Sequence, residues 1–226
     1  MGSKMGGKMA SKMNRVKVKI CGMTRLDDVR AAADAGTDML GFVFAPSPRQ
    51  LTTDSASRLL DAVPAGIVSV ALFMNQSAGY VNEVLKSGLI GLLQFHGDED
   101  NEFCASFCLP FIKAIAMGDG SRPEDAARDY PDAQGLLYDS HVPGGPGGSG
   151  DTFDWGQLPR GRQPAWLAGG LTPYNVADAV MQCKPWAVDV SSGVEDAPGI
   201  KNRELVEAFI HNAKSVKIED QRTQKQ

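Results

Sequence analysis

Strand-like and helix-like segments alternate along this chain, and the alternation predicts an α/β fold, a single (β/α)8 TIM barrel with eight parallel strands. Two further observations favour this fold class. Eight such units fit within about 200 residues, a length typical of a compact closed barrel. No Gly-x-Gly-x-x-Gly turn follows the first strand, which weakens the alternative of an open dinucleotide-binding sheet.

The strands are expected where short apolar runs stop at a polar residue or a glycine. The first alternates polar and apolar residues and stops at Cys21 and Gly22, and the last stops near Asp189 and opens into serines. In chain order, the expected strands cover residues 15–20, 38–44, 66–73, 89–95, 110–116, 135–138, 166–168 and 186–190.

The helices are expected between these strands, and each is bounded by residues that end or begin a helix. The first closes at Gly36, and the second ends at Pro64. Thr172 and Pro173 suit the N-cap and first position of a helix after the seventh strand. The sequence pattern for a helix after Asp154 is weak. The other helices are expected at 26–35, 54–63, 80–87, 98–107, 123–129, 173–182 and 203–215.

The length of 226 residues suits one large domain, and 42% hydrophobic with 22% charged residues is ordinary for a soluble protein. We expect a disordered extension at 1–14, which lacks the apolar core of a signal peptide, a barrel at 15–216 and a flexible tail at 217–226. The net charge of −4 argues against nucleic-acid binding. No apolar run reaches membrane-spanning length, so a cytoplasmic protein is expected.

Four cysteines are scattered along the chain without a Cys-x-x-Cys pair: Cys21, Cys104, Cys108 and Cys183. Disulfide bonds are not expected in a cytosolic protein of this size. Cys104 and Cys108 are predicted to share a helix face, but no histidine or second thiol pair stands nearby. We therefore expect no metal site.

Two consecutive strands near the C-terminus end in small residues that leave the backbone open. Free N–H groups in such a turn, followed by a helical start, form a cradle for a phosphate group. The expected phosphate-binding residues are Gly169 and Gly170 after the seventh strand, and Asp189, Ser191, Ser192 and Gly193 at the end of the eighth.

Chemically capable side chains also sit at strand ends, which in a barrel converge on one face. Cys21 is either a small buried residue or a thiolate base, and Asp139 either caps its loop or carries a proton. Arg49, in a proline-flanked loop, is either a solvated charge or a clamp for a carboxylate. His96 is interpreted first as structural, with a place at the substrate site as the alternative. Asp189 is expected to orient its neighbours rather than react.

The glycine-rich segment 140–154 is either a linker or a lid that folds over the substrate. With this segment included, seven motifs lie in order at the strand ends. They are KICGMT (19–24), GFVF with SPR (41–49), QFHG (94–97), YD (138–139), GGSG with FDW (147–155), AGGL (168–171) and VDVSSGVE (188–195).

From about residue 15 to 214, this series of motifs resembles the phosphoribosylanthranilate isomerase family. The resemblance implies an Amadori rearrangement of N-(5-phosphoribosyl)anthranilate in tryptophan biosynthesis, without cofactor or metal. By the same resemblance Asp139 is the general acid, Cys21 the general base, and Arg49 the group that holds the anthranilate carboxylate. Phosphate would be held by backbone N–H groups near Gly170, Ser191 and Ser192. The chain departs from the family pattern at Met23 and in a longer loop at 141–146, and a monomer or a homodimer is compatible with it.

Three other functions stay open. An indole-glycerol-phosphate synthase would need a lysine acid, and Lys113 lies inside the expected fifth strand. A pentose-phosphate epimerase would show metal-binding histidines, and the chain has only His96, His141 and His211. A catalytically silent sensor of a phosphate ligand would bind without turnover, although the presence of both Cys21 and Asp139 argues against it.

Overall fold

The computed structural model describes residues 15–118, 123–140, 155–159, 161 and 163–217. The extension expected at 1–14, nearly all of the expected tail and the segment 141–154 lie outside these described residues. His141 and the GGSG motif fall in that segment.

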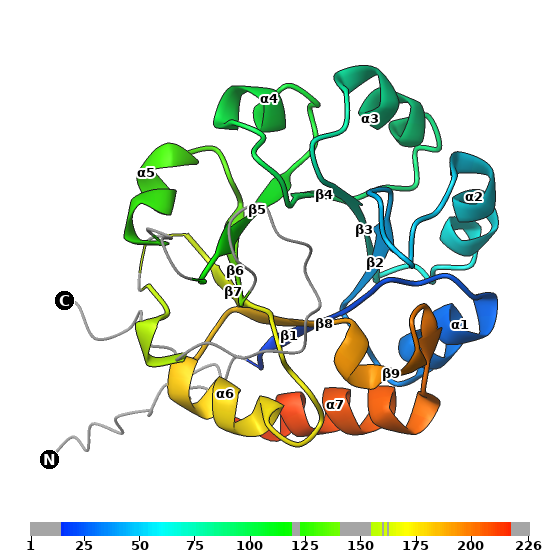
Figure 1. The fold of residues 1–226 in the computed structure, drawn as a ribbon. Helices are drawn as coiled ribbons and strands as arrows, with labels where there is room; N and C mark the ends of the chain where they lie inside the picture. Colours follow the sequence, from blue (N-terminus) through cyan, green and yellow to red (C-terminus); the bar gives the residue numbers. More distant parts are fainter. Residues whose placement is uncertain (1–14, 119–122, 141–154, 160, 162, 218–226) are drawn as a thin grey trace, which may run out of the picture.

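Eight parallel strands close into a barrel in the order in which they occur along the chain (Figure 1), which confirms the predicted fold class. The barrel closes where the last strand pairs with the first, with Lys19 beside Asp189. The strands are β1 (Lys17–Cys21), β2 (Met39–Val43), β3 (Val68–Phe73), β4 (Leu92–Phe95), β5 (Phe111–Ala116), β6 (Gly135–Asp139), β7 (Ala165–Leu167) and β8 (Ala187–Val190).

The helices form a ring outside the strands (Figure 1). They are α1 (Leu26–Asp34), α2 (Thr53–Asp61), α3 (Ala78–Leu85), α4 (Asn101–Ala105), α5 (Ala126–Asp129), α6 (Val176–Cys183) and α7 (Arg203–Ser215). Three 3-10 turns, η1 (Pro123–Asp125), η2 (Trp155–Gln157) and η3 (Ser192–Val194), and a hairpin of β9 (Glu195–Ala197) with β10 (Ile200–Lys201) complete the described elements. None of the described helices is long and apolar enough to cross a membrane.

Local capping explains where several helices begin. Thr52 and Ser55 form a capping box at α2, since each side chain accepts a hydrogen bond from the other residue's backbone N–H. Asn202 caps α7 by accepting from the N–H of Leu205 at 3.0 Å. These polar caps set the entry of the two helices into the outer ring.

Two local predictions are wrong. The helix expected from Pro173 begins only at Val176, because Asn175 holds the preceding residues in a turn by accepting from Thr172 N at 2.8 Å. Thr172, expected as the cap of the helix, accepts from the N–H of Tyr174 at 3.3 Å within this turn. Cys108 shares no helix face with Cys104, because α4 ends at Ala105 and Cys108 lies beyond it with a left-handed φ of 54°.

The strands present two different faces. Alternate residues, among them Val18, Ile20, Val188 and Val190, pack outward in the main core beneath the helices. The opposite set forms a separate cluster of Met39, Val70, Leu92, Ile112, Ala114, Leu137, Trp166, Ala168 and Ala187, which fills the barrel interior. Nearer the carboxyl ends, polar inward residues such as Asp139 and Asp189 stand beside a small apolar cluster that contains Val43, and this mixture creates the site.

Candidate functional site

A pocket opens at the carboxyl ends of the strands, where the apolar filling of the barrel stops. Val43, Leu72 and Met74 give it an apolar wall on the β2–β3 side. It also brings together the ten residues that the sequence indicated for the site: Cys21, Arg49, His96, Asp139, Gly169, Gly170, Asp189, Ser191, Ser192 and Gly193.

An ion pair lies at the base of this pocket, between neighbouring strands. Lys19 of β1 is fully buried and donates a hydrogen bond from Nζ to Asp189 Oδ2 of β8 at 2.8 Å. Burial acts to lower the pKa of Lys19, but Asp189 and Cys21 together outweigh burial, and the pKa is raised. Lys19 therefore stays a cation inside the barrel.

Cys21 follows Lys19 by two residues on β1, so both side chains point inward. The two share the space left by Gly41 on β2: a Cβ at Gly41 would lie 2.7 Å from Cys21 Sγ and 3.1 Å from Lys19 Cε. Cys21 is 6% exposed, and burial raises the pKa of its thiol above the ordinary value although Lys19 works in the opposite direction. The glycine thus allows a thiol and an ammonium group to lie side by side.

Asp139 is the last residue of β6 and points into the same pocket from another sector of the barrel. Its Oδ2 lies 3.9 Å from His96 Nε2, and His96 Nδ1 lies 3.4 Å from Gln94 Nε2. This places His96 at the pocket, next to the carboxylate, rather than at a purely structural corner. The arrangement sets a carboxylate and an imidazole across the pocket from Cys21.

Arg49 reaches back across the pocket mouth instead of pointing into solvent. Its Nε and one terminal nitrogen donate to the two oxygens of Glu195 at 2.8 and 2.6 Å, a two-pronged pair. Lys201 also donates to Glu195 at 2.6 Å and to the carbonyl of Ser191 at 3.1 Å. Burial opposes ionisation of Glu195, but the hydrogen bonds from Arg49 and Lys201 lower its pKa. Two cations against one carboxylate leave this cluster with a net positive charge.

The two glycine- and serine-rich turns lie next to each other because β7 pairs with β8. They pack directly: a Cβ at Gly193 would lie 2.0 Å from the carbonyl oxygen of Leu171, so only glycine fits there. In the first turn, Asn175 Nδ2 donates to the carbonyl of Gly170 at 2.9 Å. In the second, η3 starts at Ser192 and offers backbone N–H groups to an anion.

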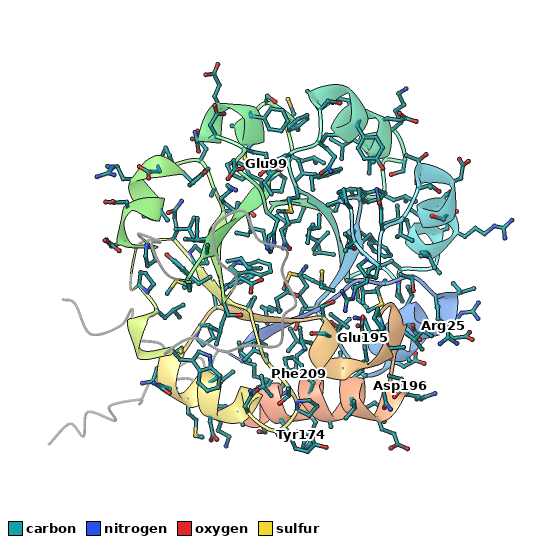
Figure 2. All side chains as sticks on the ribbon, in the orientation of Figure 1. Arg25, Glu99, Tyr174, Glu195, Asp196 and Phe209 are labelled. Atoms are coloured by element: carbon teal, nitrogen blue, oxygen red, sulfur yellow. The ribbon has the colours of Figure 1, made fainter. Side chains whose placement is uncertain are left out.

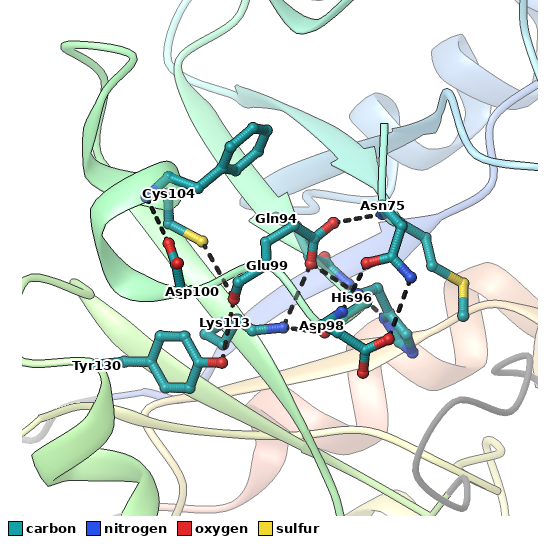
Figure 3. A network of polar contacts seen from close by, with 12 residues as sticks. Asn75, Gln94, His96, Asp98, Glu99, Asp100, Cys104, Lys113 and Tyr130 are labelled. Atoms are coloured by element: carbon teal, nitrogen blue, oxygen red, sulfur yellow. Dashed lines mark hydrogen bonds and ion pairs between the residues drawn. The ribbon is translucent and has the colours of Figure 1, made fainter. Parts of the chain in front are cut away.

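Lys113, the lysine considered for a synthase, does not line this pocket. It lies on the outer face of β5, where Nζ contacts the carbonyl of Gly97 and lies 3.4 Å from Glu99 Oε2 (Figure 3). Glu99 in turn accepts from the N–H groups of Asn75 and Gly97 at 2.6 and 2.9 Å. This outer network anchors the loop after β4, and its position argues against the synthase alternative.

Three charged residues of the pocket region were missed by the sequence reasoning: Lys19, Glu195 and Lys201. Lys19 had a local signal, because a residue two positions before Cys21 shares its face of the strand. Glu195 had none, since its partner Arg49 lies on a distant loop, and Lys201 meets Glu195 only because the β9–β10 hairpin pairs the two residues. Among the described residues, no group of three or more His, Cys, Asp or Glu side chains is placed to hold a metal ion.

Fold and site together define an enzyme of the (β/α)8-barrel class with its pocket at the carboxyl ends of the strands. The family model for N-(5'-phosphoribosyl)anthranilate isomerase matches residues 18–212. The chain belongs to this family, whose isomerases act in tryptophan biosynthesis.

Individual relatives agree with the family match. The chain is 52% identical over 202 residues to the N-(5'-phosphoribosyl)anthranilate isomerase of Thiobacillus denitrificans, covering 88% of this chain and 98% of the relative. It is 48% identical over 212 residues to that of Stenotrophomonas maltophilia, covering 91% and 96%. The crystal structure of the Thermotoga maritima isomerase has a TM-score of 0.80 at 38% identity, covering 89% of this chain and all of that one. Another isomerase structure, in complex with reduced 1-(o-carboxyphenylamino)-1-deoxyribulose 5-phosphate, has a TM-score of 0.75 at 33% identity and the same coverage.

Proposed function

We propose that this chain converts N-(5-phosphoribosyl)anthranilate to 1-(2-carboxyphenylamino)-1-deoxyribulose 5-phosphate by general acid–base catalysis, with Asp139 as the acid and Cys21 as the base. The observation that carries the proposal is that these two side chains, from β6 and β1, line one pocket. An acid and a base that reach a sugar from separate sectors are what this rearrangement requires.

The chemistry has two proton-transfer steps. Asp139 donates its proton to the ribose ring oxygen while the C1–O bond breaks, and the nitrogen lone pair forms the C1=N bond of a protonated imine. The Cys21 thiolate then removes the C2 proton, and the C2–H electrons form a C1=C2 bond as the imine nitrogen takes up the electron pair. The resulting enolamine tautomerises to the ketone. The imine is the electron sink, so the scheme uses no cofactor.

The two ends of the substrate differ in charge and polarity, and the pocket offers a matching surface to each. The phosphate is placed against the backbone N–H groups near Gly170, Ser191 and Ser192, with Gly169 and Gly193 beside them. The anthranilate ring is placed against the apolar wall. A guanidinium carries five N–H donors, of which Glu195 takes two, so Arg49 has others for the anthranilate carboxylate.

His96 and Asp189 support the reacting groups in this proposal. His96 contacts the Asp139 carboxylate and reaches the substrate from the β4 side. Asp189 forms an ion pair with Lys19 and orients the side chains at the floor of the pocket. Their inclusion at the substrate site rests on the pocket that they line together.

A cytoplasmic location belongs to the same proposal. No disulfide joins any two of the cysteines that the structure describes, as is usual in a reducing compartment.

A monomer or homodimer is proposed for the assembly, in line with a Thermotoga maritima relative that is described as dimeric and from which monomers were generated.

The test is the loss of anthranilate fluorescence when freshly made phosphoribosylanthranilate meets the purified protein without added metal or cofactor. The decay is expected to disappear in Asp139→Asn and in Cys21→Ala, while inorganic phosphate still binds. Cys104→Ala is the matched control, because Cys104 is fully buried on α4 and away from the pocket. Normal turnover in either pocket variant would contradict the assigned roles.

A further inference from the structure

Lys19 is a charged side chain enclosed in the barrel just below the pocket. It has no exposed surface, and its Nζ contacts Asp189 at 2.8 Å. The described lining of the pocket includes Asp189 and Cys21 but not Lys19. Lys19 therefore acts on a bound substrate only through these neighbours.

Stability alone is a weak reason for this ion pair. Removing an ammonium and a carboxylate from water costs several kcal/mol per ion, and well-packed apolar residues in their place are often as stabilising or more so. The inner cluster directly below is apolar throughout, with residues such as Leu137 and Trp166. A cation at this depth is better explained by what it does to a neighbouring group.

Cys21 is the neighbouring group that the geometry selects. It points to the same face of β1 as Lys19, and both side chains occupy the space that a Cβ at Gly41 would need. A side chain at position 41 would collide with the thiol sulfur and press on the lysine stem. The strand, its register and the glycine thus keep the ammonium group beside the sulfur.

Four charged groups act on Cys21 from the surrounding elements: Lys19 from β1, Asp189 from β8, Arg49 from the loop after β2, and Lys201 from β10. Arg49 and Lys201 are both engaged by Glu195 at 2.6 to 2.8 Å. Burial raises the pKa of the thiol, and Lys19 is the strongest of the influences that lower it. Of the three cations, Lys19 thus has the largest effect on the sulfur.

We propose that the Lys19 ammonium group, held in place by Asp189, is a positioning residue that favours the thiolate form of Cys21 for removal of the substrate's C2 proton. The proposal rests on the role of Cys21 as the base. Lys19 keeps its own proton throughout. The substrate proton passes to the thiolate, which becomes a thiol beside the unchanged ammonium group.

The test is a pH titration of the thiol in Lys19→Met, which removes the charge at similar volume. Thiolate formation is followed by ultraviolet absorption without substrate, and the curve of the matching Cys21→Ala protein is subtracted to isolate this one thiol. The midpoint is expected to rise by about one pH unit, which is tenfold less thiolate at any lower pH. The alkaline shift is expected again in the pH profile of kcat/KM, with KM little changed. An unchanged midpoint would overturn the proposal.

A second variant covers the case in which Lys19→Met fails to fold because Asp189 is left as a lone buried charge. In Lys19→Met/Asp189→Asn both charges are gone, and a smaller upward shift of the midpoint is expected, because Lys19 affects the thiol more strongly than Asp189 does. A midpoint at or below that of the parent protein would overturn the proposal here as well.

Lys113→Met is the matched control, because Lys113 is also a buried barrel lysine near a carboxylate but lies on the outer face. The titration midpoint of Cys21 in this variant is expected to match that of the parent protein. A shift as large as that of Lys19→Met would show a general loss of barrel integrity and would overturn the proposal. The proposed base is judged separately: turnover that persists in Cys21→Ala would remove Cys21 from the chemistry, whatever Lys19 does to its titration.

Discussion

Two buried lysines of this barrel are paired with carboxylates, yet they occupy opposite faces of the sheet. Lys19 on β1 points inward and meets Asp189 at 2.8 Å beneath the pocket. Lys113 on β5 points outward to Glu99 at 3.4 Å and to the loop after β4. The pKa of Lys19 is raised because Asp189 and Cys21 together outweigh burial, whereas burial prevails and lowers the pKa of Lys113.

The difference teaches that the face of the strand on which a lysine lies, rather than its residue type, decides whether it acts at the pocket or anchors a loop. Lys19 shares its face with Cys21, while Lys113 shares its face with Phe111 in the outer core. Figure 2 places Glu99 and Glu195 in different sectors of the barrel, and each has its own charged partners: Lys113 for Glu99, and Arg49 and Lys201 for Glu195. Glu195 pairs directly with Arg49 of the pocket, whereas Lys113 and Glu99 are not among the described residues that line it. Changes on the inner face are therefore expected to affect turnover, and changes on the outer face to affect stability.

The largest expected effect is on turnover, and it comes from the inner face. Cys21→Ala and Asp139→Asn are each expected to lower kcat by about a thousandfold, because each removes a general acid or base. Their thermal unfolding is expected to stay close to that of the parent protein. Steady-state kinetics and calorimetry on the same samples check both parts. A variant with a lowered unfolding temperature and an unchanged kcat would contradict the assignment of turnover to the inner face.

The next effect is on stability, and it comes from the outer face. Lys113→Met leaves Glu99 buried without its cation and is expected to lower the free energy of unfolding by about 3 kcal/mol. Urea unfolding measures this, with Lys113→Met/Glu99→Gln as the control that removes both charges and recovers part of the loss. Equal instability of the double variant would show that packing of the lysine stem, rather than its charge, matters at this position.

A smaller effect is expected where the positive cluster meets the pocket. Arg49→Ala is expected to raise KM by about thirtyfold, equivalent to a charged hydrogen bond worth about 2 kcal/mol, with a lesser change in kcat. Glu195→Gln keeps Arg49 but weakens the pairing that fixes its side chain, and it is expected to raise KM less than Arg49→Ala does. Titration with anthranilate checks the assignment directly, and an unchanged affinity in Arg49→Ala would remove it from the site.

The smallest expected effect is a pH dependence. The pKa of Glu195 is lowered in the folded protein, so its pairing with Arg49 and Lys201 stabilises the fold above the ordinary glutamate pKa. This contribution is lost as the pH falls through the lowered value. Acid unfolding curves of Glu195→Gln are expected to be shallower in that range, and an identical slope would show that the carboxylate is not stabilised there.

Much of the fold followed from local patterns. The order of strands and helices, the closed parallel barrel and the strand ends at Cys21, Asp139 and Val190 were all predictable. The start of α6 was not, because the Asn175 side chain holds a turn where Thr172 and Pro173 suggested a helix. Nor was the position of Cys108, since α4 is only a short helix that ends before it.

The pocket residues were predictable for a related reason. Parallel strands in a barrel bring their carboxyl ends to one face, so reactive residues at those ends had to converge. Their contacts were not predictable. Arg49 was expected to be solvated or bound to a ligand, and its pairing with Glu195 links positions that lie 146 residues apart.

By itself, the sequence determined the alternating elements, the residues at the strand ends and, through the two-residue period of a strand, which of them share a face. Only the tertiary structure decided which charge meets which partner. Lys19 and Asp189 lie 170 residues apart and become neighbours because β8 closes the barrel on β1. The physical reason is that periodicity acts over a few residues, whereas ion pairing depends on a closure that involves the whole chain.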